Sequence, residues 1–398
     1  MRKIIVVLFF LVVGATLQAQ PVLRTMLRLP DTGQQNSYTS TFGEDSDYLI
    51  NQPAYTLNGD GTITDTNTTL MWQQTDGGEM TIEAAMIYCD TLTLGGYQDW
   101  RMPNCHELFS ILHHDRSNPA MDTNYFTNTR AEYWWSYQRQ TNDSNKVWVT
   151  NAGGGVGNHL KTETISAGGT KKFHVRAVRD LVPPITLPNH FINNGDGTTT
   201  DLVTNLVWQQ VPTTDTITWE QALIMADTLQ AAGYNDWRVP NIKELQSIND
   251  ESNFNPSVAD NYFPGIIIGQ YWSSTTLPNQ STRAWYWDTR FGITTYAFKT
   301  SRKYLLCVRG GDLLTNLNSS PSITRLTTIF PNPSTGAVTI KCEALMDEVE
   351  IISFQGKSQH LFPNASVVQI DPGAPGLYVV KVVSRNLVTS KMLVILGQ

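Results

Sequence analysis

The sequence predicts an α+β protein with two tandem copies of one domain and a small β-sandwich behind them. Three observations lead to this prediction. The middle of the chain repeats itself at a nearly constant offset, and each copy changes from strand-like alternation to a helical period of apolar residues. Beyond residue 326, the pattern consists of alternation and turns alone.

The repeat is carried by several short motifs. Residues 58–65, 71–74 and 96–104 recur as residues 194–201, 207–210 and 233–241. The pair Tyr133 and Trp134 also recurs, as Tyr271 and Trp272. Trp208 follows Trp72 by 136 residues, and Trp237 follows Trp100 by 137. Near-constant spacing across this length indicates a domain duplication.

Each copy opens with a β-hairpin. The Asn-Gly-Asp-Gly segments at residues 58–61 and 194–197 contain residues that tolerate positive φ. Thr-rich alternation follows and ends at Trp72 or Trp208, as expected for a half-buried strand.

Two helices should follow in each copy. One apolar face is formed by Ile82, Ala85, Met86, Cys89 and Leu92, and its counterpart by Trp219, Ala222, Leu223, Ala226 and Leu229. A second, short helix begins at Asn104 or Asn241, because a glutamate stands three residues later as a capping box requires. Short strands and long loops complete each copy, which ends at Val178-Arg179 or Val308-Arg309.

The start of the chain and its composition indicate an exported protein. Residues 1–19 combine a positive start, an apolar run and a small-residue cleavage site, as in a signal peptide, with a retained anchor as the alternative. The sequence contains no later run of 18 apolar residues, so no transmembrane segment is predicted there. Charged residues make up 16% of the chain and the formal net charge is −7, which argues against nucleic acid as a partner.

In combination, the motifs resemble the DUF1566 family, the domain at the C-terminal end of the Legionella collagen-like adhesin. The motifs are Gly-Asp-Gly-Thr-x-Thr-Asp, Asp-Trp-Arg-x-Pro-Asn-x-x-Glu-Leu and a closing Val-Arg. The resemblance covers residues 50–181 and 189–312, behind an N-terminal extension at residues 20–49. It implies tandem domains similar to the C-type-lectin and formylglycine-generating-enzyme folds, with any ligand site in their loops.

The tail resembles a type IX secretion C-terminal sorting domain, type A. Residues 313–326 read as a linker, and residues 327–398 show the alternation of a β-sandwich. The resemblance is carried by Pro331, Asn332, Pro333, Gly336, Gly356, Gly376, Tyr378 and Lys391. It implies export through the periplasm and outer membrane by the type IX machinery, followed by release or surface attachment. An ordinary periplasmic β-domain is the alternative.

Charged residues in the shared motifs are expected to be structural. A buried arginine clamped by a carboxylate would fix the loop between the two helices of each copy. The residues concerned are Asp99, Arg101 and Glu107 in the first copy and Asp236, Arg238 and Glu244 in the second.

No metal or cofactor is expected. The Asn-Gly-Asp-Gly segments could hold calcium, but the same residues make a hairpin turn. The neighbouring His113 and His114 invite a metal interpretation that the second copy does not share. Cys89 could pair with Cys105, and the bridges typical of the family lack one partner in each copy.

The aromatic residues are the candidate ligand-binding set, since exposed rings stack on sugars and anchor protein ligands. Packing into the core is the alternative for each of them. The set comprises Trp134, Trp135, Trp148, Trp272, Trp285, Tyr286 and Trp287.

These features predict a non-enzymatic, adhesin-like protein of the cell surface or medium. Its tandem domains would recognise an extracellular glycan or protein, with the duplication adding avidity. A secreted hydrolase or modifying enzyme with an unrecognised site, and a structural protein of the extracellular layer, are the alternatives.

Overall fold

The computed structural model describes residues 22–127, 129, 132–164, 172–310, 327–353, 357–384 and 387–396. The expected signal peptide at residues 1–19, the linker at 313–326 and the turn residue Gly356 lie outside these ranges.

Short strands dominate the protein. Of the described residues, 38% lie in strands and 10% in helices, and the strands form many small sheets. The predicted α+β class, with C-type-lectin-like or formylglycine-enzyme-like domains, is therefore wrong. The periodicity located the helices, but these are only one to three turns long, whereas the Trp- and Thr-rich stretches beyond them form the longer strands.

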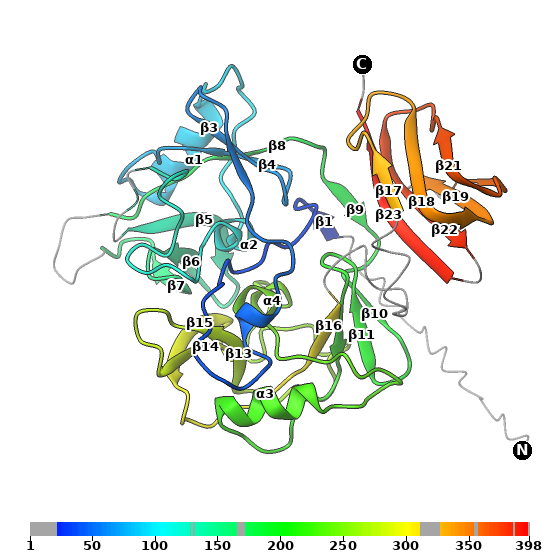
Figure 1. Ribbon diagram of the computed structural model, residues 1–398. Helices are drawn as coiled ribbons and strands as arrows, with labels where there is room; N and C mark the ends of the chain where they lie inside the picture. Colours follow the sequence, from blue (N-terminus) through cyan, green and yellow to red (C-terminus); the bar gives the residue numbers. More distant parts are fainter. Residues whose placement is uncertain are drawn as a thin grey trace, which may run out of the picture.

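Within its described residues, the first repeat contains two sheets and two helices (Figure 1). One sheet has the order β2 (Tyr55–Leu57), β3 (Thr62–Asp65), β4 (Leu70–Gln73) and β8 (Val178–Asp180). The other has β5 (Tyr133–Gln140), β6 (Asp143–Asn151) and β7 (Val156–Leu160). The helices are α1 (Ile82–Thr91) and α2 (Cys105–Ser110), and both begin where the sequence predicts.

The second repeat has the same element order. One sheet runs β10 (Phe191–Asn193), β11 (Thr198–Asp201), β12 (Leu206–Gln209) and β16 (Val308–Gly310). The other runs β13 (Gln270–Thr276), β14 (Arg283–Asp288) and β15 (Ile293–Phe298). Its helices are α3 (Trp219–Asp227) and α4 (Ile242–Ser247).

Strand register corrects the sequence match between the repeats by one residue. The backbone N–H of Trp135 donates to the carbonyl of His174, and that of Trp272 donates to the carbonyl of Tyr304, both at 3.0 Å. Trp135 and Trp272 are therefore equivalent, at an offset of 137 instead of the 138 that matching Tyr133 with Tyr271 implies. The same register makes Trp148 of β6 equivalent to Trp285 of β14.

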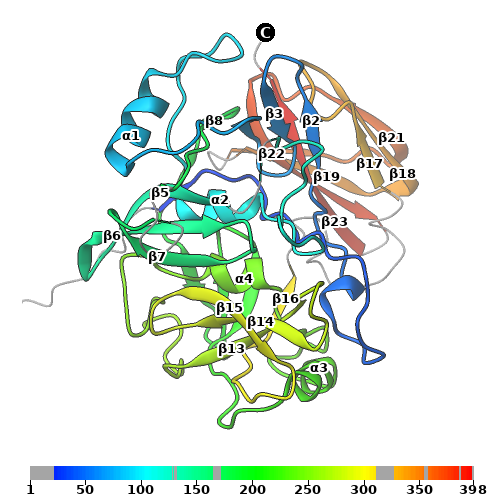
Figure 2. The same ribbon diagram turned by 90° about the vertical axis from the view of Figure 1, so that its left-hand side faces the viewer.

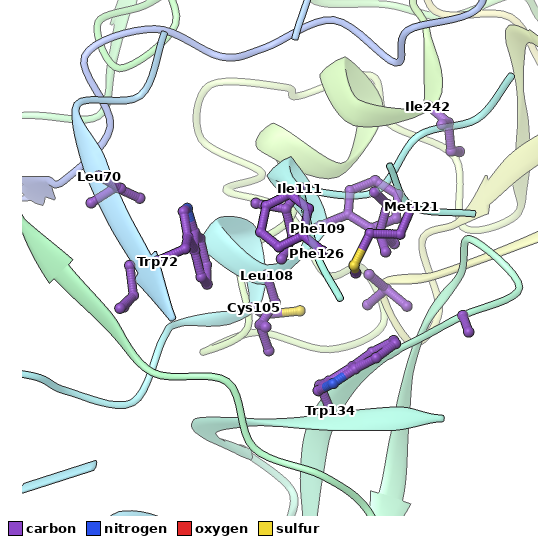
Figure 3. Close-up of a cluster of buried hydrophobic side chains, with 14 of the residues drawn as sticks. Leu70, Trp72, Cys105, Leu108, Phe109, Ile111, Met121, Phe126, Trp134 and Ile242 are labelled. Carbon is purple, nitrogen blue, oxygen red and sulfur yellow. The ribbon is translucent and has the colours of Figure 1, made fainter. Parts of the chain in front are cut away.

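The two repeats pack against each other through equivalent elements. Helix α2 contacts α4, and β7 contacts β15, so the interface is built like that of a two-fold dimer within one chain (Figure 2). The main hydrophobic cluster of the first repeat includes Ile242, Leu277 and Trp285 of the second. Figure 3 shows Ile242 beside this cluster, which contains Trp72 and Trp134.

An N-terminal segment binds along both repeats. Strand β1 (Val22–Arg24) pairs with β9 (Ile185–Leu187) in the connection between the repeats. The segment then passes α4, where Lys243 Nζ donates to the carbonyls of Asp31 at 2.8 Å and Ser110 at 2.7 Å. Residues 38–48, which we call the strap, contain the short 3₁₀ helix η1 (Asp45–Asp47) and lie on the second repeat near β13 (Figure 1).

The C-terminal strands form two facing sheets with their own core (orange to red in Figure 1). One sheet contains β17 (Thr327–Phe330), β18 (Val338–Met346) and β21 (Ala365–Ile370). The other runs β20 (Ser358–Leu361), β19 (Glu348–Ser353), β22 (Gly376–Ser384) and β23 (Leu387–Ile395). Among the described residues, no helix is long and apolar enough to cross a membrane.

Trp285 should be a stability residue of both repeats. Its ring is buried and packs edge-on against His114 of the first repeat, with ring centroids 5.4 Å apart. We expect Trp285→Ala to lower the free energy of unfolding by about 3–5 kcal/mol, the usual cost of deleting a buried indole. Denaturant unfolding followed by circular dichroism measures the loss.

The matched control is Tyr286→Ala, because the neighbouring Tyr286 ring is only partly buried and should cost less. Equal losses for the two variants, or separate unfolding transitions for the two repeats in the parent chain, would contradict a shared core.

Candidate functional site

The Asp-Trp-Arg-x-Pro-Asn-x-x-Glu motif folds into a loop that is clamped to the helix behind it. In the first repeat, Asn104 caps α2, and its side chain accepts a hydrogen bond from the N–H of Glu107 at 2.7 Å. The Glu107 carboxylate accepts from the N–H of Asn104 at 2.9 Å and from both terminal nitrogens of Arg101, at 2.8 and 2.7 Å. One carboxylate thus caps the helix and anchors the arginine.

The second repeat repeats this clamp in a drier setting. Arg238 donates to both oxygens of Glu244, at 2.6 and 2.5 Å, and to the carbonyl of Gly310 at 3.0 Å. The Arg238 side chain is 5% exposed, compared with 30% for Arg101, whose remaining carboxylate partner is Asp180. The arginine of the clamp is therefore covered in the second repeat and partly exposed in the first, whereas the carboxylate is buried in both.

The motif aspartates bind a different arginine from the one beside them. Asp99 accepts from Arg179 at 2.7 and 2.9 Å, and Asp236 accepts from Arg309 at 2.7 and 3.0 Å. The hydrogen bond from Arg179 holds the pKa of Asp99 below its ordinary value. Each pair fastens the end of its repeat to the loop before the short helix.

The Asn-Gly-Asp-Gly segments form tight turns. Asp60 Oδ1 accepts from the N–H and the hydroxyl of Thr62, at 3.0 and 2.6 Å, and Asp196 makes the same two bonds to Thr198. Within the part of the chain that the structure describes, no group of three His, Cys, Asp or Glu side chains is placed to hold a metal ion.

His113 and His114 lie between the repeats. His114 Nε2 lies 2.9 Å from the carbonyl oxygen of Gly154, and its ring packs against Trp285. Burial, with Lys243 nearby, lowers the pKa of His114 to about 3 and that of His113 to about 4. Both rings are therefore neutral parts of the interface at ordinary pH.

The cysteines of the repeats do not form a bridge. Cys89, Cys105 and Cys307 are buried free thiols, so the pairing of Cys89 with Cys105 is not formed. Burial raises the pKa of the Cys89 thiol to about 12, which leaves little reactive thiolate at neutral pH.

Most of the aromatic candidate residues lie in the core. Trp134, Trp135, Trp148, Trp272, Trp285 and Trp287 are buried, and Tyr286 is partly exposed. Several indole N–H groups have protein partners, including Asp76 Oδ2 at 3.0 Å for Trp134 and the carbonyl of Ile217 at 2.9 Å for Trp272. The six buried indoles therefore offer no open face on which a ligand could stack.

An apolar groove on the first repeat was not foreseen from the sequence. It has a volume of about 420 Å³ and lies between α1, the motif loop and β5. Its exposed members are Met86 at 48%, Ile87 at 65% and Tyr137 at 50%. We call it the first-repeat groove, and it is completed by Asp90, Trp100, Arg101 and Met102.

A signal for this groove was present in the helix. Ile87 is an apolar residue that lies off the helical face formed by Ile82, Ala85 and Cys89, so it cannot join the core with them. Of the apolar face predicted for this helix, Ile82, Ala85 and Cys89 are buried and Met86 is not.

Comparison with known families agrees with this organisation. The family model described as the Lcl C-terminal domain matches residues 61–179 and 197–309, which together are more than half of the chain. The chain belongs to the Lcl C-terminal domain family. No curated protein sequence matches it.

A second family model defines the tail of this Lcl-type protein. The model described as a secretion system C-terminal sorting domain matches residues 328–396. The chain is accordingly exported through the periplasm and the outer membrane, to the surface or the medium, by the type IX machinery. Within the tail, Tyr378 is buried and its hydroxyl donates to the carbonyl of Ala374 at 2.8 Å.

The two arginine clamps should differ in their contribution to stability. Arg238→Ala leaves the buried Glu244 carboxylate without its partner, so we expect a loss of about 3–5 kcal/mol in the free energy of unfolding. Arg101→Ala should cost less, because the Arg101 side chain is 30% exposed and its removal would let water reach the Glu107 carboxylate beneath it. Adding Glu244→Gln to Arg238→Ala should restore part of the lost free energy of unfolding, because it removes the unpaired charge. Equal losses for Arg238→Ala and Arg101→Ala would contradict the proposed effect of arginine burial.

Acid should weaken the interface through His114. Its pKa is about 3 in the folded chain and 6.5 as the ordinary value. The neutral ring therefore contributes stability that is complete above pH 6.5 and is lost as the pH falls toward 3. Between pH 6 and pH 4, unfolding free energies of the parent chain should fall more steeply than those of His114→Gln, by about 1.4 kcal/mol per pH unit. Parallel curves would show that His114 does not carry this effect.

Proposed function

We propose that this chain is an exported, non-enzymatic binding protein that uses the first-repeat groove as its ligand site. The sorting domain supports action outside the cell, where an adhesin-like protein meets its ligand. The duplication supports a scaffold role for the second repeat and a binding role for the first, because equivalent surfaces are covered by the N-terminal segment in the second repeat and exposed in the first.

The single observation behind the ligand site is the exposed apolar groove. Its volume of about 420 Å³ lies within the range of ligand sites, roughly 300–1,000 Å³. Clustered exposed side chains such as Met86, Ile87 and Tyr137 leave apolar surface in water, which usually marks an interaction site.

The lining of the groove favours recognition over catalysis. It is mainly apolar, and its arginine, Arg101, is already engaged by Glu107 and Asp180. A group held in this way positions the motif loop and is poorly suited to proton transfer. Binding through apolar contacts should depend only weakly on salt.

A binding array tests the proposal. The secreted chain is applied to immobilised extracellular glycans and matrix proteins, in parallel with Ile87→Glu and Ile224→Glu. These two positions are equivalent on α1 and α3, and both are exposed, so the variants carry the same change on the two repeats. We expect Ile87→Glu to lower the affinity by about tenfold or more and Ile224→Glu to leave it unchanged. A ligand bound equally by both variants would exclude the groove as its site.

A further inference from the structure

The duplication places the same groove on both repeats, and the structure fills one of them. Thr276 of β13 and Arg139 of β5 occupy equivalent positions, because each pairs with an equivalent residue after the same irregularity, Ala284 or Val147. The same offset of 137 relates Leu223 of α3 to Met86 of α1. Leu223 is fully buried, whereas Met86 is 48% exposed.

The strap is what covers the second repeat. Gly43 lies against Leu223, and a methyl group placed on Gly43 would come within 3.5 Å of the Leu223 Cβ. The hydroxyl of Thr276 donates to Glu44 Oε1 at 2.8 Å. The ring centroid of Tyr48 lies 5.5 Å from Cζ of Arg238, the counterpart of the groove residue Arg101.

One end of the site lies beside the first residue of the short helix, Ile242 in α4 or Cys105 in α2, and it is filled differently in the two repeats. In the second, the hydroxyl of Thr275 accepts from the N–H of Ile242 at 3.0 Å and donates to Asp45 at 2.6 Å. In the first, Gln138 takes the place of Thr275: its Oε1 accepts from the N–H of Cys105 at 2.6 Å, and its Nε2 donates to Glu251 at 3.4 Å.

Glu251 therefore stands in for Asp45 in the first repeat. The outer, apolar part of the site and the position equivalent to Glu44 remain open there.

The charge at that open position points to the kind of occupant. The strap contains Glu44, Asp45 and Asp47 and neither lysine nor arginine. Where the second repeat offers Glu44 the neutral hydroxyl of Thr276, the first repeat has the exposed Arg139. A carboxylate arriving beside Arg139 gains a charge-assisted hydrogen bond, which is stronger than the bond from a hydroxyl.

We propose that the first-repeat groove binds an acidic peptide segment of a partner protein, in the way that the second repeat holds its own strap. A carboxylate of the peptide pairs with Arg139, and the residue before it lies on Met86. This assignment rests on the proposed binding function and names the class of its ligand.

The probe for this test is a synthetic, fluorescein-labelled peptide with the sequence of residues 36–50, titrated into the secreted full chain. Fluorescence anisotropy should show saturable binding of one peptide per chain. Met86→Glu should weaken this binding by about tenfold or more, because it places a carboxylate against the acidic peptide. Ile224→Glu on the second repeat is the control and should leave the affinity unchanged.

A charge exchange tests the contact with Arg139. Arg139→Glu should weaken binding of the parent peptide, and a Glu44→Lys peptide should recover affinity for the Arg139→Glu chain. Because Met86 and Arg139 are exposed, both variants should keep the far-ultraviolet circular dichroism and melting temperature of the parent. If Met86→Glu does not keep these properties, Ile87→Glu replaces it as the groove variant.

Four outcomes would overturn the proposal. The first is the lack of saturable binding, and the second is an equal loss of affinity in Met86→Glu and Ile224→Glu. The third is an affinity that Met86→Glu leaves unchanged, as expected if the peptide displaces the strap from the second repeat. The fourth is self-association of the chain that Met86→Glu abolishes. The last result would make a second copy the occupant. If the peptide fails while an array ligand still depends on Ile87, the binding function stands and only the acidic-peptide assignment falls.

Discussion

Burial of apolar surface between α2 and α4 joins the two repeats, and the placement of the other elements depends on it. Trp285 and Ile242 of the second repeat complete a cluster that also contains Trp72 and Trp148 of the first. Because the contacting elements are equivalent, the repeats meet like the halves of a two-fold dimer. Helices α1 and α3 lie on opposite outer sides of the pair (Figure 2).

Polar groups of the N-terminal segment break this two-fold relation. Asp31, Gln34, Glu44 and Asp45 are buried, and burying such groups is unfavourable unless each finds a partner. The partners come mostly from the second repeat: Asn241 donates to Asp31 at 3.0 Å, and Gln34 exchanges hydrogen bonds with the backbone of Thr276. The segment therefore has one well-matched site, and the outer part of the first-repeat groove remains uncovered.

The two repeats carry different residues at equivalent positions near the N-terminal segment. Lys243 of α4 reaches carbonyls of Asp31 and Ser110, whereas its counterpart His106 of α2 pairs with Glu251 at 2.7 Å. Burial between the repeats lowers the pKa of Lys243 to about 8. In the first repeat, Arg139 and Tyr137 replace Thr276 and Ser274 at the uncovered edge, so charge and ring surface are offered to solvent.

Local features were readable from the sequence because they depend on neighbouring residues. The Asn-Gly-Asp-Gly turns, the capping boxes at Asn104 and Asn241, the starts of the helices and the sorting tail follow from short-range geometry or from spacing along the chain. The fold class did not follow, since the balance of strand and helix depends on how far each element extends once it is packed. Burial of the tryptophans, the one-residue shift between the repeats and the open groove were decided by tertiary structure. The physical reason is distance along the chain. Leu223 is buried because Gly43, far away in the sequence, packs against it, whereas Met86 at the equivalent position is 48% exposed.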